Sequence, residues 1–231
     1  MKKRHVIFLA LLLCSLAGCY FNPVKQHLFE VSAHIVAMKT KFGKDYLKPN
    51  LLSHFPNEIK DTTNLRLHSS PPSCPPSFEC RKQFGEVYLI TTRDTITEKW
   101  IKENYLYKTE YQSEDNIIIN LPELKFDRFP IEKCNKEFNN KYPIPYFESY
   151  DFNLGEKEFE KIIDGEKYWD YVYTIPNDLE VYVIQGESGN YWKKKCNENR
   201  PETLKKWKNG YSKGIAVSKE KEMMIYWIMV W

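Results

Sequence analysis

Apolar residues recur along most of the chain with one of two spacings, and each spacing predicts an element. Steps of three and four residues predict a helix, whereas alternation or a β-branched run predicts a strand. The first helical pattern follows Pro23 and predicts an amphipathic helix ending near residue 42. Its apolar positions are Leu28, Val31, Ile35, Met38 and Phe42.

A second helix is predicted after Thr95-Ile-Thr-Glu98, which has the form of a capping box. In that motif the hydroxyl and the carboxylate each bond a backbone N–H at the start of the helix. The helical face that follows would comprise Ile96, Trp100, Ile101 and Tyr105.

Two later segments also have helical features. Pro201 and Gly210 stand at the positions that favour a helix start and a helix end, so residues 201–209 predict a helix. Residues 156–163 predict a short helix, and its buried face would comprise Phe159, Ile162 and Ile163.

Strands are predicted where β-branched and aromatic residues cluster. Glu86–Thr92, Asn116–Leu121 and Asp178–Gln185 have this composition, and residues 186–190 (GESGN) predict the turn after the last of them. Residues 141–152 are aromatic but interrupted by proline, which favours an edge segment over a central strand.

The C-terminal residues predict a β-hairpin. Gly214–Ser218 is followed by a KEKE turn and by the run MMIYWIMVW. The run is apolar at consecutive positions, so we expect a central strand covered on both faces, with Trp227 and Trp231 in the core. The interleaved elements indicate an α+β fold, with a mixed or antiparallel sheet, a few helices on one side and this hairpin at the end.

The N-terminal segment has a different pattern. Lys2, Lys3 and Arg4 precede an apolar run over residues 6–18, which is shorter than the roughly 20 residues that cross a bilayer. Its length suits a secretory signal. The run ends in Leu16-Ala17-Gly18-Cys19, which resembles the lipobox of bacterial lipoproteins.

This resemblance covers only the first nineteen residues and implies a lipid anchor at Cys19. Residues 1–18 would be a signal peptide, 19–42 a lipidated tether and helix, and 43–231 a single globular domain. Two or three acyl chains give stable anchoring, whereas one chain gives marginal binding. Tyr20 stands where Asp favours inner-membrane retention, so the resemblance implies the outer membrane, with the body in the periplasm.

Charge and cysteine content fit such an envelope protein. The chain has 34 basic and 31 acidic residues, and Lys2, Lys3 and Arg4 leave with the signal, so the mature side chains balance at 31 each. This balance argues against nucleic acid as a partner. Four cysteines remain besides Cys14 and Cys19, and in an oxidising compartment they predict disulfides in one of three pairings. These are Cys74, Cys80, Cys134 and Cys196.

No motif for catalysis, a metal or a cofactor stands out. His27, Glu30 and His34 share a helical stripe, but their spacing is not HExxH, and we interpret them as a solvated helix face. His54 and His68 do not lie beside a Ser or Cys in a recognisable nucleophile motif. The sequence therefore favours a protein that is not an enzyme.

Aromatic residues offer the one binding hypothesis. Tyr191 and Trp192 follow the GESGN turn and could stack on a sugar or a peptide, although core filling is the alternative. The overall interpretation is an envelope lipoprotein with a binding or structural role, and an envelope protein or a glycan as partner. The alternatives are a glycan- or peptide-binding module that uses exposed aromatics, and a hydrolase whose site is assembled from distant residues.

Overall fold

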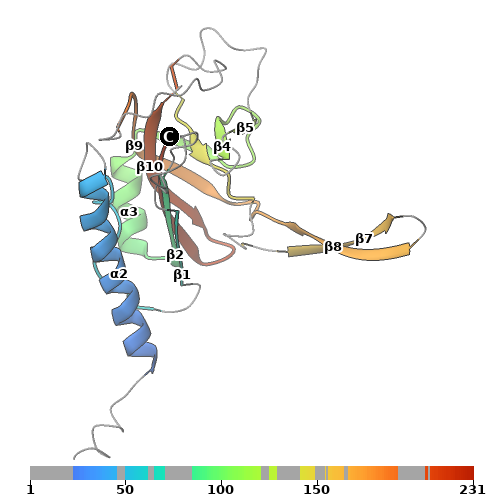
Figure 1. The fold of residues 1–231 in the computed structure, drawn as a ribbon, viewed down its shortest axis with the longest axis horizontal. Coiled ribbons are helices and arrows are strands. Elements are labelled where there is room, and N and C mark those ends of the chain that lie inside the picture. The colour runs from blue at the N-terminus through green and yellow to red at the C-terminus, as the bar shows by residue number, and fades with distance from the viewer. Residues whose placement is uncertain are drawn as a thin grey trace, which may run out of the picture.

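A six-stranded antiparallel sheet forms the centre of the computed structural model (Figure 1). The structure describes residues 23–45, 50–61, 65–70, 85–120, 125–128, 141–148, 154, 156–163, 166–191, 206–207 and 209–231. In spatial order the strands are β1 (Arg66–Ser70), β2 (Gly85–Thr92), β11 (Met223–Val230), β10 (Gly210–Ser218), β9 (Glu180–Ser188) and β3 (Tyr107–Glu110). The predicted strands at 86–92 and 178–185 are confirmed as β2 and β9.

Strand β11 lies in the middle of this sheet and is buried along its whole length. Alternate residues point to opposite faces, so its apolar run fills two separate cores. Ser218 of β10 pairs with Met223 of β11 across the turn of residues 219–222. The prediction that this strand is central and covered is confirmed, and Trp227 and Trp231 are core residues.

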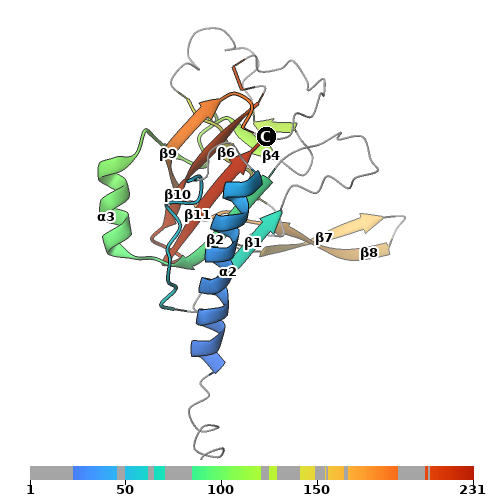
Figure 2. The same cartoon turned by 60° about the vertical axis from the view of Figure 1, so that its left-hand side comes forward.

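Helix α2 (Pro23–Asp45), the turns of residues 50–61 and helix α3 (Thr95–Asn104) cover one face of the sheet, which we call face one (Figure 2). The predicted helix after Pro23 is confirmed, because Ile35 is fully buried and Leu28 and Val31 are partly buried against the same core. The buried residues that these segments contribute are Ile35, Leu51, Leu52, Phe55, Ile59 and Ile101.

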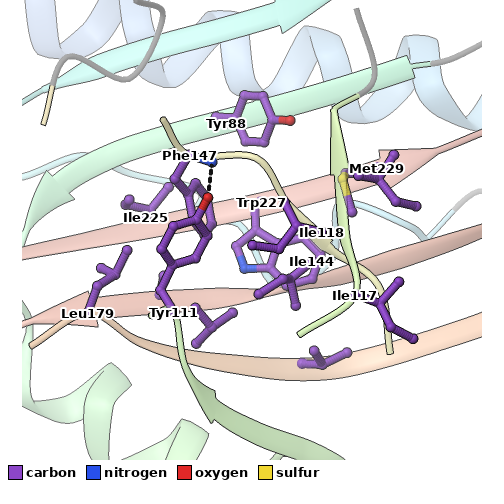
Figure 3. Packing of buried hydrophobic residues seen from close by; sticks show 14 of the residues in the cluster. Tyr88, Tyr111, Ile117, Ile118, Ile144, Phe147, Leu179, Ile225, Trp227 and Met229 are labelled. Carbon is purple, nitrogen blue, oxygen red and sulfur yellow. Dashed lines mark hydrogen bonds between the residues drawn. The ribbon is translucent and has the colours of Figure 1, made fainter. Parts of the chain in front are cut away.

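Loops and a small three-stranded sheet cover the opposite face, face two. This sheet has the order β5 (Lys125–Arg128), β4 (Ile118–Asn120), β6 (Ile144–Pro145). The β4 segment confirms the predicted strand at 116–121, and β6 confirms the edge segment within 141–152. Figure 3 shows these residues around Trp227, where the Phe147 amide donates to the Tyr111 hydroxyl at 3.1 Å.

The predicted helix over residues 156–163 is wrong. These residues form β7 (Glu156–Ile163), which pairs antiparallel with β8 (Glu166–Tyr173) in a two-stranded sheet. The ribbon projects from the body in both views (Figures 1 and 2). The apolar residues fit helical spacing, but pairing with the aromatic strand β8 decides the conformation, and Ile162 is 66% exposed.

Two expectations about α3 are also corrected. The N-cap is Asp94, not Thr95, because the Asp94 carboxylate accepts from the amides of Ile96 and Thr97. Of the predicted apolar face only Ile101 is buried, since α3 turns its Ile101 and Glu98 side to the body. Ile96, Trp100 and Tyr105 are exposed.

Mostly antiparallel strands with two helices in the described chain confirm the α+β class. Among the described residues, no helix combines the length and apolarity needed to span a bilayer. The lipobox, all six cysteines, Trp192 and most of the predicted helix at 201–209 lie outside the described residues.

Candidate functional site

A cleft of about 410 Å³, with both polar and apolar lining, opens between residues 56–61 and the start of α3. The C-terminal end of β2 and Tyr226 of β11 complete its walls. Three segments far apart in the sequence therefore build it. Its lining includes Lys60, Asp61, Thr92, Arg93, Asp94, Thr97 and Tyr226.

Tyr226 forms the apolar side of this cleft. Its ring packs 5.9 Å from the Phe55 ring, and the residue is almost entirely buried. The hydroxyl points to Thr97, 3.4 Å from Oγ1, a long contact that leaves it able to bond a ligand. Burial raises the pKa of Tyr226, so this hydroxyl stays protonated at neutral pH.

The charged groups of the cleft are held by their neighbours. The Thr97 hydroxyl and the amides of Thr97 and Ile96 donate to the Asp94 carboxylate, and these bonds hold its pKa below the usual value. Asp61 Oδ2 accepts from the Thr92 hydroxyl at 2.8 Å. Arg93 Nε donates to Glu98 at 2.7 Å, which raises the pKa of the guanidinium.

This chemistry suits recognition of a small polar ligand. Asp94 is an ionised helix cap, and a general acid needs the opposite shift, a carboxyl pKa raised toward neutrality. The Asp94 and Asp61 carboxylates accept hydrogen bonds from the Thr97 and Thr92 hydroxyls. Threonine and tyrosine hydroxyls, a lysine and two carboxylates offer hydrogen bonds to a small polar ligand.

A second polar cluster lies on face two near the β1 edge. Glu86 is 4% exposed, and the Tyr88 hydroxyl donates to it at 2.5 Å. His68 Nε2 lies 3.6 Å from the other carboxylate oxygen, and its ring stacks on Tyr88 at 5.9 Å. A carboxylate beside an imidazole can orient the ring.

A third cluster lies under the turn of residues 50–55 on face one. Lys213 is buried and donates to Ser53 Oγ at 3.2 Å and to the Asn50 carbonyl at 3.4 Å. His54 Nε2 donates to the Trp227 carbonyl at 3.0 Å, and its Nδ1 is buried without a hydrogen bond. Burial, then the charge of Lys213, lowers the pKa of His54 to about 3, so the ring is neutral.

The hydroxyl and the ring of the predicted binding residue Tyr191 both contact other residues of the fold. Its hydroxyl donates to Glu187 at 2.8 Å, and its ring packs edge-on against Tyr211 at 4.6 Å. Tyr191 is partly buried and packs against the core of face one. Tyr191 is therefore a packing residue. Trp192, the other residue of the predicted pair, lies outside the described residues.

The positions of Glu30 and His34 fit the interpretation of their stripe as a solvated helix face. Glu30 and His34 lie on the exposed side of α2. In the described ranges no three His, Cys, Asp or Glu side chains converge in a group that could hold a metal ion. The candidate disulfide residues Cys74, Cys80, Cys134 and Cys196, and the lipidation residue Cys19, fall outside those ranges.

Sequence reasoning missed the cleft because its residues come from three separate segments. The one local signal was Thr-Thr-Arg-Asp at 91–94, a polar run between a strand and a helix. Such a run at the start of a helix predicts a cap. Comparison of the chain with models of known protein families, with curated proteins and with solved structures finds no significant match.

Proposed function

We propose that this chain is a lipid-anchored protein of the bacterial cell envelope whose body has a binding or structural role. The observation that carries the proposal is Leu16-Ala17-Gly18-Cys19, placed directly after a cationic head and a short apolar run. This order is that of a signal peptide whose processing leaves an acylated cysteine as the first residue.

The start of the fold is compatible with such an anchor. Helix α2 begins at Pro23, four residues after Cys19, and four extended residues reach at most about 14 Å. Further along the same helix, Ile35 is fully buried in the core of face one. A lipid on Cys19 would therefore hold the body close to the bilayer surface.

Replacement of Cys19 tests the anchor. We expect Cys19→Ala to abolish incorporation of labelled palmitate and to release the protein from the membrane fraction. Cys14→Ala is the matched control, because residue 14 lies in the part of the signal that would be removed. A Cys19→Ala protein that sediments with membranes like its parent would overturn the proposal, and density-gradient separation of the membranes tests the outer-membrane address.

Recognition of a glycan or a peptide is the second candidate function. The hydroxyl-lined cleft beside Tyr226 favours it, and Tyr191 does not, since its hydroxyl is bonded to Glu187. Calorimetric titration with soluble cell-wall glycopeptide fragments tests it. We expect Tyr226→Phe to weaken binding at least fivefold and the matched Tyr191→Phe to leave it unchanged.

The other outcomes of this titration would contradict the proposed binding site or the proposed ligand. Loss of binding in Tyr191→Phe alone would move the site to the turn after β9. No heat with the parent protein would remove glycopeptides as ligands. The hydrolase alternative has less support, because the hydrogen bonds that lower the pKa of Asp94 keep this carboxylate ionised. Appearance of cleaved fragments during the titration would revive that alternative.

A further inference from the structure

Helix α2 carries a second group of apolar residues, on the side turned away from the core. Phe29 is 73% exposed and Val36 is 50% exposed, and Ala33 between them is also exposed. Successive residues of a helix are about 100° apart, so these three side chains lie within about 60° of one another. We call Phe29, Ala33 and Val36 the outer stripe. Large apolar side chains gathered on an exposed surface mark an interaction site.

The polar side chains that follow the outer stripe are already bonded to the protein. Lys39 Nζ donates to the Phe55 carbonyl and to Asn57 Oδ1, at 2.7 Å in each case, so its charge is held against the body. Thr40 continues the line of the outer stripe, and its hydroxyl donates to the Val36 carbonyl at 3.2 Å. Because this bond pairs the hydroxyl within the helix, Thr40 can lie against an apolar surface.

The exposed ionisable residues of α2 lie to one side of the outer stripe. Glu30 and His34 are about 100° and 140° around the helix from Phe29. The third side of the helix packs in the core, where Ile35 is fully buried. An outward apolar stripe beside a polar flank is the pattern of a helix that lies in the plane of a membrane interface.

The place of α2 in the chain indicates what covers the outer stripe, given the lipid proposed at Cys19. The helix begins four residues after Cys19, a reach of at most about 14 Å, and Phe29 lies about 9 Å further along the helix axis. Acyl chains on Cys19 would therefore hold α2 at the bilayer. Because the side of α2 that contains Ile35 is buried in the core, the outer stripe remains to face lipid. Both views place α2 on the outside of face one (Figures 1 and 2).

We propose that α2 lies along the membrane surface, with the outer stripe buried between lipid headgroups and acyl chains. This inference rests on the proposed lipid anchor. From Phe29 to Thr40 the contact is about 16 Å long, which is small for a membrane-binding surface by itself. The anchor raises the effective concentration of α2 at the bilayer, so a weak second contact becomes occupied. That contact stops the body from rotating freely on its tether.

A fluorescent amino acid placed at single positions of the full-length lipidated protein tests this orientation. The protein is reconstituted in vesicles of phosphatidylethanolamine and phosphatidylglycerol that contain a nitroxide-labelled lipid as quencher. We expect about fivefold stronger quenching at positions 29, 33 and 36 than at 30 and 34, because the outer stripe would lie roughly 5–10 Å below the surface. Positions 30 and 34 are matched controls, since they are exposed on the same helix at similar distances from Cys19.

Two patterns of quenching would overturn the proposal. An upright helix would give quenching that falls steadily from position 29 to position 36, whichever side of the helix carries the probe. A probe at position 29 that is shielded from water before vesicles are added would show that a second copy, or another segment of the chain, covers the outer stripe.

Serine variants separate the contact from the anchor. Phe29→Ser combined with Val36→Ser should reduce quenching at position 33 to the level at position 34, whereas Ile162→Ser, at an exposed apolar residue of β7, should not. Circular dichroism should show both proteins folded. Labelled palmitate on Cys19 without the helical pattern of quenching would overturn the orientation alone. A protein without palmitate would overturn the proposed anchor, and the orientation with it.

Discussion

At the scale of single residues, the backbone packs very closely around Gly214. A Cβ at this position would lie 2.0 Å from the Tyr182 carbonyl oxygen and 2.7 Å from Trp227 Cζ2. The register of β10 on β9 also shifts between Lys213 and Gly214. A glycine is required here because the irregular pairing brings two backbones and an indole ring into contact.

We therefore expect Gly214→Ala to destabilise the fold by about 3 kcal/mol, the upper range for overpacking a core. Urea denaturation measures this loss. Gly186→Ala is the control, since its Cβ would approach closest to one ring atom of Tyr142, a side chain that can move. Equal losses in the two variants would contradict the role assigned to the Gly214 contact.

His54 gives the second prediction at this scale, a loss of stability in mild acid. Its folded pKa is about 3, lowered by burial and by Lys213, whereas an unfolded histidine titrates near 6.5. Between these values only the unfolded chain binds the proton, so stability falls as the pH drops below about 6.5. His54→Gln should lose less stability between pH 7 and pH 5 than the parent protein.

Urea denaturation at the two pH values measures the difference. His34→Gln is the control for removal of an imidazole at an exposed position of α2, and a change as large as that of His54→Gln would contradict the role of His54. A His54→Gln protein with an unchanged profile would show that this ring takes up its proton in the folded state.

At the scale of elements, strands were predictable where the apolar pattern was unambiguous. The run from Met223 has no polar position to place in solvent, so both its burial and its central place followed from composition. Glu86–Thr92 was equally clear because β-branched residues dominate it. The sequence also indicated the first helix, since its apolar residues recur at helical spacing.

Where the predictions of elements were wrong, contacts between distant parts of the chain determine the structure. Residues 156–163 have apolar residues at both helical and strand spacings, and only the partner β8 selects the strand. For α3, periodicity identified a helix but not the side that faces the body. Ile101 is buried beside Glu98, whose carboxylate is neutralised by Arg93 and Lys102. The cleft was missed for the same reason, since its walls meet only in the fold.

The contribution of the N-cap Asp94 to the stability of α3 can be tested. Asp94 satisfies two amides at the start of the helix, at 3.3 and 3.0 Å. We expect Asp94→Ala to cost about 1 kcal/mol, while Asp94→Ser keeps most of the capping energy. Urea denaturation of the two variants checks this. Equal loss in both would mean that the charge of Asp94, rather than its capping oxygen, stabilises the helix.

At the scale of the whole molecule, the fold is one main sheet with an arm. Both faces of the six-stranded sheet carry continuous cores, whereas β7 and β8 form a separate ribbon (Figure 1). A two-stranded ribbon contributes little stability of its own in water. The stability of the body is therefore concentrated in the main sheet.

Removal of the arm tests this division. We expect replacement of residues 156–173 by a short Gly-Ser linker to change the free energy of unfolding by about 1 kcal/mol or less, or roughly 2–4 °C in Tm. Phe147→Ala, in the core of face two, should instead cost about 3 kcal/mol. Thermal melts followed by circular dichroism compare them. A collapse of the sheet on removal of the arm would show that the ribbon is integral to the body.

The position of β11 has a consequence for how the chain is made. It follows every other strand of the main sheet in chain order, yet it lies between β2 and β10. A polypeptide still emerging from a ribosome or a translocase therefore has an interrupted sheet and two uncovered apolar strands. Productive folding must wait for Met223–Val230, and products of premature termination should be cleared by proteases instead of accumulating as folded fragments.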